Sequence, residues 1–375
     1  MISYDNKFPR YISYDTEYHY KPYQGAFYLQ DRIELDVMVA NIGVRYDFFN
    51  PRAQRPAIER QIINIDSAWI VHHASSVPAR IKFQISPRIG VTFPITKTSD
   101  IRFNYGHFFQ MPQFEYLYTN TNLNVTYGFA PLGDPDLKPA RTIAYEMGYR
   151  ASFHDTYLLD ITLFTKEVNN LVDSNTLLNS NPHQGGIFTY GYTQFVNSAN
   201  VYINGLEILL KKRFNNFMGG SISYTFMHAK GMSSSAFDQV EWLDTDIKPS
   251  LDEHPLSWDQ RHTLVIDLNI KFTPTFKGNF LWRWNSPLPY THYQGPNTYL
   301  NNARLTSTYF LDLRVEKTFF IKNNRTQFYG EIYNLFGNEF VLWKDIYNRT
   351  GGPLHDISAY DLGRRIQLGI IFHYK

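Results

Sequence analysis

Two clusters of histidine and acidic residues have the types of side chain that bind metal ions. His72 and His73 are adjacent, and Asp252, Glu253 and His254 follow one another in a polar stretch. Adjacent side chains point to opposite sides of a strand, and no other His or carboxylate stands at ligand spacing from the histidine pair. We therefore interpret both clusters as solvated loop residues and predict no metal site.

A third group has the residue types of acid–base catalysis. Asp259, Arg261 and His262 lie close together where a loop enters a predicted strand. Such a position also suits a salt bridge and hydrogen bonds that fix the loop, and we favour this structural role. No Ser–His–Asp arrangement and no pair of carboxylates stands out from the many other charged residues. The sequence therefore predicts neither an enzyme nor a cofactor.

Aromatic side chains in the predicted loops are better candidates for ligand contact. Aromatic rings near a polar opening can hold sugars, peptides or chelates. The same residue types also form the girdle at a membrane interface or pack loops together, so both interpretations stay open. The loop from Tyr116 to Tyr127 is the first to test. The candidates are Tyr116, Tyr118, Tyr127, Phe129, Tyr190, Tyr192, Trp242, Tyr290, Tyr293 and Trp343.

The composition of the chain limits what kind of protein positions these residues. It contains no Cys, which excludes thiol catalysis and cysteine-ligated metals and suits an exported protein without disulfides. The net charge of +2 gives no field that would favour nucleic acid, so no nucleic-acid partner is expected. Aromatic residues make up 17% of the chain, yet its mean hydropathy is negative. A β-barrel wall that is apolar on one face combines these properties.

About thirteen segments alternate between apolar and polar residues with the two-residue period of a strand. A polar loop with Pro51 and Pro56 as breakers is predicted from Asn50 to Ala79, and helices are limited to a turn or two within loops. No run of about 18 apolar residues occurs, so no transmembrane helix is predicted. The predicted strands are 23–34, 37–48, 85–95, 100–108, 141–153, 156–169, 188–214 (long and bulged), 217–230, 261–272, 276–285, 309–321, 325–336 and 366–374.

Charged residues such as Arg102, Asp160 and Glu331 share one face of these strands, and the other face is almost entirely apolar. In a soluble sandwich the apolar faces meet, whereas in a membrane barrel they contact lipid and the charged face lines a wet lumen. Turns of about two to four residues alternate with loops of roughly fifteen to thirty, as in transmembrane barrels. These features favour an all-β, antiparallel up-and-down transmembrane β-barrel with short periplasmic turns and long extracellular loops.

The last predicted strand has the pattern of closing strands in outer-membrane barrels. A polar residue, a Gly two positions later, and two aromatic residues separated by one position stand at its end. This pattern predicts a signal for the barrel-insertion machinery and an apolar face in contact with outer-membrane lipid. The signal residues are Gln367, Gly369, Phe372 and Tyr374.

Several short motifs follow one another in a fixed order. They are YLQD at 28–31, NIGVRYD at 41–47, NYGHFFQMP at 104–112, FEYLY at 114–118, DPDLKP at 134–139, YEMG at 145–148, NGLE at 204–207, WDQRH at 258–262 and YNLF at 333–336. Together they resemble the barrel domain of TonB-dependent outer-membrane receptors from about residue 22 to the end. Ala140 replaces the Glu, and Asp134 the Asn, of the family's "NP-x-LKPE" segment, and Lys375 replaces a terminal aromatic residue.

The resemblance also indicates what is missing. Family members carry a signal, a TonB-binding box, a plug and a barrel of about 22 strands. We expect this chain to be the C-terminal portion of such a barrel at 22–375, preceded at 1–21 by a loop or strand extension. The first and last of thirteen strands would run in the same direction, so we predict an open, curved sheet with two unpaired edges rather than a closed barrel.

The resemblance implies a function in the outer membrane of a Gram-negative cell. The expected activity is TonB-dependent uptake of a scarce, bulky solute such as a siderophore, cobalamin, an oligosaccharide or a peptide. The TonB complex would act only through a plug that this chain does not contain. Two alternatives remain at this point: a passive porin-like or structural barrel, and a soluble β-rich carbohydrate-binding or hydrolytic protein.

Overall fold

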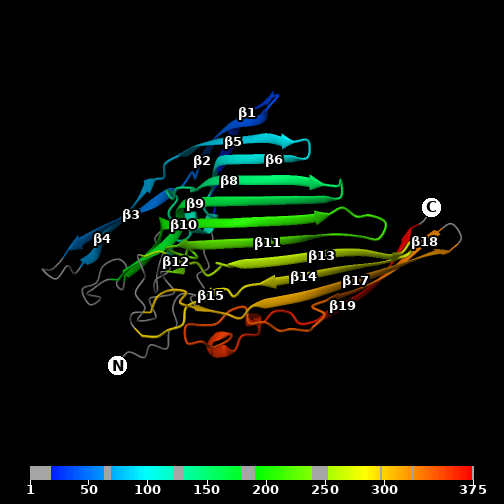
Figure 1. Ribbon diagram of the computed structural model, residues 1–375. Coiled ribbons are helices and arrows are strands. Elements are labelled where there is room, and N and C mark those ends of the chain that lie inside the picture. The colour runs from blue at the N-terminus through cyan, green and yellow to red at the C-terminus, as the bar shows by residue number, and fades with distance from the viewer. Residues whose placement is uncertain are drawn as a thin grey trace.

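The computed structural model describes residues 18–62, 69–121, 131–178, 191–238, 252–295, 298–321 and 324–373. A 15-stranded sheet dominates this structure, with thirteen long strands along one path and two short strands attached to its side (Figure 1). In order along the path, the long strands are β1 (Tyr23–Leu35), β2 (Met38–Asn50), β5 (Lys82–Thr96), β6 (Ser99–Gln110), β8 (Ala140–Phe153), β9 (Tyr157–Leu178), β10 (Gly191–Lys212), β11 (Met218–Gly231), β13 (His262–Thr273), β14 (Phe276–Asn285), β17 (Thr308–Ile321), β18 (Asn324–Tyr333) and β19 (Arg365–His373).

The sheet is open, as the sequence predicted. Within the described ranges β1 pairs with β2 alone and β19 with β18 alone, so each strand leaves one edge unpaired. Every pair along the path is antiparallel and joins strands that follow one another in the chain, apart from short loop strands. The sheet therefore has the up-and-down order of a barrel wall without its closure.

The two ends of the strands differ. Short connections, such as 36–37, 154–156 and 274–275, all lie at one end, named here the turn end. Long connections, such as 111–139, 232–261 and 334–364, lie at the other, named the loop end. Figure 1 shows the short loop strands gathered at that end, on the left.

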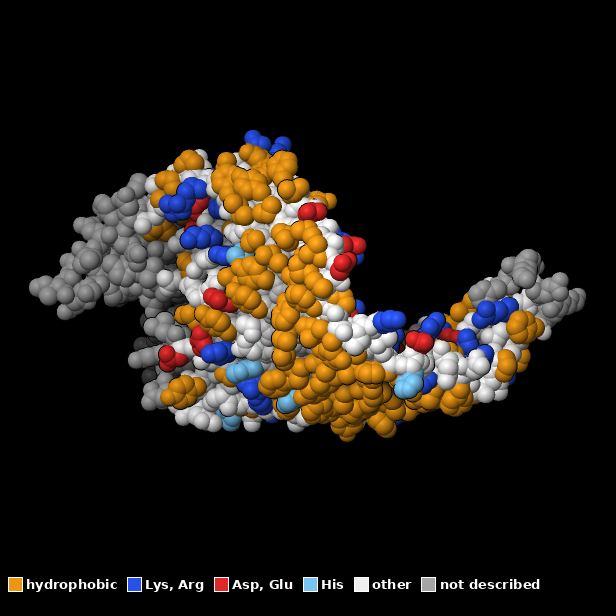
Figure 2. Space-filling model, turned by 45° about the horizontal axis from the view of Figure 1, so that its top comes forward, with side chains coloured by type: hydrophobic (Ala, Val, Ile, Leu, Met, Phe, Trp, Pro, Cys, Tyr) orange, Lys and Arg blue, Asp and Glu red, His pale blue; other side chains and the backbone are white. Residues whose placement is uncertain are grey.

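The two-residue alternation gives the sheet a polar and an apolar face. On the polar face, Arg314 of β17 lies opposite Glu331 of β18, which lies opposite Gln367 of β19. On the apolar face, one residue earlier or later along each strand, Ile332 lies between Leu313 and Ile366. Figure 2 shows the hydrophobic side chains of the apolar face as a continuous band across the strands.

Strands β9 and β10 extend beyond the rest of the sheet at the loop end. The predicted strand 156–169 ends too early, because β9 continues to Leu178 against β10. The predicted bulge is present, since the register shifts twice between Val196 and Val201, opposite the left-handed Asn170. The bulge lets the extension at the loop end bend relative to the part of β9 and β10 nearer the turn end.

The predicted polar loop from Asn50 to Ala79 is also wrong, because it contains a hairpin of β3 (Gln54–Ile62) and β4 (Trp69–Pro78). Pro56 does not prevent pairing there. In a two-stranded hairpin each strand has a free edge, and a proline can direct its missing N–H to that edge.

The loop end also holds the largest buried cluster among the described residues. The short helix α1 (Phe114–Tyr118) supplies two of its residues. Two short strands lie at the same end: β7 (Pro131–Leu132) is parallel to β10, and β12 (His254–Pro255) lies beside β11. The cluster consists of Phe49, Leu117, Tyr118, Leu137, Phe195 and Ala236. The core thus lies under the loops. In the described part of the chain no helix has the length and apolar character needed to cross a membrane.

Candidate ligand-binding surface

The polar face carries charges that are largely paired with one another. The Asp160 carboxylate accepts hydrogen bonds from Arg102 Nη2 at 2.6 Å and Arg150 Nε at 2.9 Å. Farther along the sheet, Arg283 Nη2 lies 2.6 Å from Asp312 Oδ2. Each of these carboxylates already has a guanidinium partner, so this part of the face forms a polar wall.

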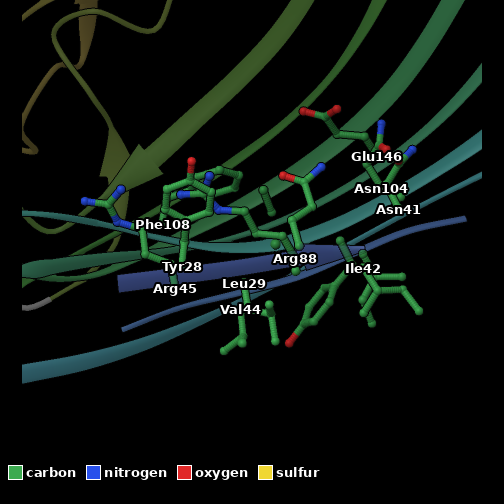
Figure 3. A pocket seen from close by; sticks show the side chains of 17 residues that line it. Tyr28, Leu29, Asn41, Ile42, Val44, Arg45, Arg88, Asn104, Phe108 and Glu146 are labelled. Carbon is green, nitrogen blue, oxygen red and sulfur yellow. The ribbon is translucent and has the colours of Figure 1, made fainter. Parts of the chain in front are cut away.

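A hollow of about 550 Å³ interrupts this wall between β1 and β8. Glycines at polar-face positions leave the space, since Gly90 lies directly between Asn41 and Asn104. Figure 3 shows Asn41, Asn104 and Glu146 on the same side of the ribbons as Arg45, Arg88, Tyr28 and Phe108, whereas Leu29, Ile42 and Val44 point to the opposite side. The hollow therefore offers amides, guanidinium groups and aromatic rings to a polar ligand.

Sequence reasoning missed this hollow, although a signal was present. Gly43 and Gly106 both lie opposite Arg88, so glycines recur on the polar register of neighbouring strands. Glycine in a strand interior often marks a site where another molecule approaches the backbone closely. Strand register was needed to place these glycines side by side.

Of two predicted contact residues, Tyr118 belongs to the buried cluster at the loop end and Tyr116 packs against it. Tyr118 is 2% exposed, its hydroxyl donates to Pro51 O at 3.0 Å, and its ring stacks on Tyr20 at 4.6 Å. The Tyr116 ring lies 4.8 Å from that of Phe195. Burial raises the pKa of both phenols, that of Tyr118 to about 12. In this arrangement Tyr118 packs loops together and offers almost no surface to a ligand.

Three other candidates form a second group, in two loops that contact each other. Tyr290 belongs to β15 (Pro289–Tyr290), which pairs with β16 (Ala303–Arg304), and its hydroxyl donates to Asn348 Oδ1 at 2.8 Å. The backbone N–H of Tyr293 donates to Ile346 O at 2.7 Å. Trp343, in the same second loop, is 37% exposed. These rings border a surface that a ligand can reach.

A cavity of about 430 Å³ lies between this second loop and the polar face of β14 to β19. Its wall includes Arg283 and Asp312 of the sheet and Asp361 from the loop. Arg365 also lines it and lies 5.0 Å above the Tyr333 ring. The loop therefore folds over the polar face, so that loop and wall residues can contact the same ligand.

The remaining candidates cannot be placed in either group. Tyr127, Phe129, Tyr190, Trp242 and Tyr374 lie outside the described residues, as does the side chain of Tyr192 in β10. The other members of the predicted insertion signal lie in β19, with Gln367 and Gly369 on the polar face and Phe372 on the apolar face. A Cβ at Gly369 would overlap the Tyr329 ring, so glycine lets this ring lie flat across the last strand.

The DPDLKP motif anchors the first long loops. Asp136 pairs with Arg80 at 3.0 Å, Lys82 at 3.1 Å and Arg55 at 3.3 Å. Burial alone would raise the pKa of Asp136, but hydrogen bonds from Arg80 and Lys82 outweigh it and hold the pKa below its usual value. The motif thus ties its own loop to the β3–β4 hairpin and the start of β5.

The predicted salt bridge at Asp259 is confirmed, and it has an additional partner. Arg261 Nε lies 2.6 Å, and Arg304 Nη2 2.8 Å, from Asp259 Oδ2. His262 does not join them, because its Nδ1 lies 2.8 Å from the Tyr224 hydroxyl on the apolar face. Across the described ranges no three His, Asp or Glu side chains converge as metal ligands would.

The carboxylate of Asp173 is buried at the loop end. Asp173 is 3% exposed and accepts a hydrogen bond from Ser174 N at 2.8 Å and weaker ones from the hydroxyls of Ser233 and Ser198. Asp173 lies beyond Asn170, outside the stretch of about ten residues that a tilted membrane strand needs. Burial, with a smaller contribution from Asp238, raises the pKa of Asp173 to about 7.

Comparison with known proteins places this architecture in a family. Several solved receptors share the fold, each at low identity. The ferric-catecholate import receptor Fiu from E. coli K12 aligns at 16% identity and a TM-score of 0.58 over 94% of this chain and 45% of its own. A ferric enterobactin receptor (PfeA) mutant from Pseudomonas aeruginosa aligns at 15% identity and a TM-score of 0.63, over 93% of this chain and 44% of its own. A double mutant of the Serratia marcescens hemophore receptor HasR aligns at 16% identity and a TM-score of 0.60, over 93% of this chain and 51% of its own.

The chain spans about half the length of these receptors. No curated protein matches it by sequence. Residues 2–335 match the family model described as "TonB dependent receptor-like, beta-barrel". The receptors of this family are outer-membrane transport proteins of Gram-negative bacteria. The chain belongs to the TonB-dependent receptor family, as part of its β-barrel domain.

Proposed function

We propose that the chain forms wall and extracellular loops of an outer-membrane receptor for TonB-dependent uptake of a scarce, bulky solute. The observation that carries this proposal is the division of the sheet into a charge-paired polar face and an apolar face, with loops folded over the polar face at one end only. In the membrane the apolar face contacts lipid, the loop end is extracellular and the turn end is periplasmic.

In this proposal the loops and the polar face of the sheet contact the solute one after the other. Tyr290, Tyr293 and Trp343 make the first contact with the solute at the outer mouth. The hollow beside Arg45 and Arg88 receives it on the polar face. Siderophores, cobalamin, oligosaccharides and peptides all suit such a mixture of rings, amides and charges. Ferric catecholates and heme are the first solutes to test, because Fiu is a ferric-catecholate import receptor and a double mutant of HasR was solved in complex with its hemophore and heme.

Assembly and energy come from partners outside the chain. The barrel-insertion machinery reads the last strand, including Gln367, Gly369 and Phe372. The TonB complex acts through a plug. In this proposal the chain itself supplies no catalytic group.

Uptake measured with and without TonB tests the proposal. Cells that produce the protein are given a radiolabelled ferric catecholate, and accumulation is compared between strains that differ only in TonB. We expect accumulation to require TonB. Equal accumulation in both strains, together with solute conductance in planar bilayers, would favour a passive porin-like channel. Extraction of the protein into detergent-free buffer would favour the soluble alternative.

A further inference from the structure

A guanidinium lies on the apolar face of the sheet. Arg141 is the second residue of β8, and on its face it lies opposite Phe109 of β6 and Asn169 of β9. The following residues of β8 on the same face are Ile143 and Tyr145. A charged side chain on a lipid-facing surface is costly unless it reaches water or an anion. Its position at the loop end places Arg141 at the border of the apolar band.

His107 holds the guanidinium of Arg141, and Tyr105 in turn holds His107, all on the same face. Arg141 Nη2 donates to His107 Nδ1 at 3.1 Å, because a guanidinium can only donate. The His107 Nε2 therefore carries the ring hydrogen and donates to the Tyr105 hydroxyl at 2.6 Å. This chain of hydrogen bonds holds one edge of the guanidinium, and Nη1 keeps its donors free of described partners.

None of these donors meets a carboxylate of the described residues. Arg141 forms no ion pair there, and its buried Nε has no hydrogen-bond partner among them. Glu167 lies on the same face, but its carboxylate accepts from Asn169 Nδ2 at 2.9 Å. On the polar face, by contrast, Arg102 and Asp160 form an ion pair at 2.6 Å. Arg141 is therefore held in place, and no carboxylate of the described residues compensates its charge.

An apolar groove continues from this site toward the middle of the sheet. It has a volume of about 640 Å³, and its lining includes Tyr105, Tyr145, Met147 and Leu163. Tyr105 thus belongs both to the hydrogen-bond chain and to the groove, and its ring lies 5.0 Å from that of Tyr145. Figure 2 shows basic and histidine side chains at the border between the apolar band and the loops. The site of the Arg141 guanidinium and the apolar groove are therefore contiguous.

We propose that Arg141 and this groove bind a phosphorylated, acylated glycolipid of the lipid A type from the outer leaflet. The free guanidinium donors match a phosphate, which they can contact in a bidentate manner. The groove below accommodates an acyl chain. Phosphorylated glycolipid is the characteristic lipid of the outer leaflet, where the loop end lies. This step rests on the outer-membrane placement in the proposed function, but it involves no transported solute.

Native mass spectrometry of the full chain, folded in detergent, tests the proposal. The probes are lipid A, dephosphorylated lipid A and phosphatidylglycerol. We expect a single lipid A to remain bound and the other two to bind more weakly. Arg141→Gln should lower the affinity for lipid A by roughly tenfold or more, as for a lost charge-assisted hydrogen bond. The matched control is Lys317→Gln, on the apolar face at the turn end, where Lys317 Nζ donates to Thr275 Oγ1 at 3.1 Å.

Three results would overturn the proposal: equal binding of lipid A with and without phosphate, binding of phosphatidylglycerol as tight as that of lipid A, or equal losses in the two variants. If Arg141→Gln fails to fold, Met147→Trp provides a second route, because the bulkier indole fills the groove and should weaken lipid A binding by a similar factor. Unchanged binding in that variant would also contradict the proposal. A loss of solute uptake leaves these measurements unaffected, so the two proposals fail separately.

Discussion

Arg304 forms an ion pair with Asp259, which lies 45 positions earlier in the chain, at 2.8 Å between Nη2 and Oδ2. Arg261 donates to the same oxygen, and the Ala229 N–H donates to the other oxygen at 2.8 Å. The Asp259 side chain is fully buried. One carboxylate therefore joins β11, the start of β13 and the loop that carries β16.

Asp259→Asn should loosen these three segments together. The amide keeps the shape but loses the charge that holds two guanidinium groups, at a cost of about 2–4 kcal/mol. Hydrogen exchange of residues 286–305 and thermal unfolding in detergent measure the effect. Asp345→Asn is the control, because its partner Arg349 is exposed and such pairs contribute less than about 1 kcal/mol. Equal effects in the two variants would contradict the assigned role.

The stability that the Asp259 carboxylate gives to these three segments should be lost in acid. Burial alone would raise the pKa of Asp259, but hydrogen bonds from Ala229, Arg261 and Arg304 outweigh it and leave the pKa below the usual 3.8. A pKa that is lower in the folded state gives stability that is present above pH 3.8 and is lost as the pH falls through the folded-state value. Hydrogen exchange at 286–305 should therefore accelerate below about pH 4 in the wild type. In Asp259→Asn this acid step should be missing.

Because of Asp173, we expect the stability of the loop end to depend on pH in the opposite direction, at higher pH. Burial raises the pKa of Asp173 to about 7, so the folded loop end binds a proton that the opened chain releases above about pH 4. The loop-end cluster should lose stability as the pH rises from about 4 through 7, by at most roughly 4 kcal/mol at 1.4 kcal/mol per pKa unit. Limited proteolysis at pH 5.5 and pH 8 measures this. Asp173→Asn should resist protease equally at both, and a persistent pH dependence in this variant would refute the assignment.

Two aromatic candidates should behave differently when truncated. Tyr118→Ala removes a ring that is 2% exposed and should cost about 3–5 kcal/mol of stability, as large buried aromatic residues do. Trp343→Ala removes a ring that is 37% exposed, so it should change stability by less than about 1 kcal/mol but weaken solute binding roughly tenfold. Thermal unfolding and a binding titration distinguish the two. A folded Tyr118→Ala variant with weakened binding alone would assign Tyr118 to the ligand instead.

The open edges can be tested by disulfide formation, because the chain contains no Cys. Gln30 and Gly43 lie opposite each other in β1 and β2, so cysteines at these positions should form a disulfide. A cysteine at Gln30 combined with one at Gln367 or Ile371 of β19 should form none within one chain. Efficient intramolecular cross-linking of β1 to β19 in the monomer would show a closed barrel.

Much of the sheet was predictable because strand alternation is a local property. Apolar and polar residues at successive positions of β13 or β19 must face opposite sides of any sheet, whatever lies beyond it. The thirteen strands, the two faces, the bulge in β10 and the turn and loop ends therefore follow from residues close together in sequence. The unpaired edges followed as well, since an odd number of alternating strands must begin and end in the same direction.

The loops required the tertiary structure, because their contacts join distant segments. No local pattern shows that Tyr118 stacks on Tyr20 or that Arg304 pairs with Asp259. The β3–β4 hairpin was not predicted, because a proline such as Pro56 indicates the end of a strand unless the partner strand is known. The hollow beside Arg88 depends on glycines in separate strands that only register aligns.

The sequence by itself thus determined the family, the strands and which face of the sheet is polar. Only the tertiary structure decided which side chains of the loop end are buried and which can meet a ligand. The physical reason is the range of the interactions. Strand periodicity is set by neighbours two residues apart, whereas burial of Asp173, Tyr118 and Asp259 depends on loops brought together from across the chain.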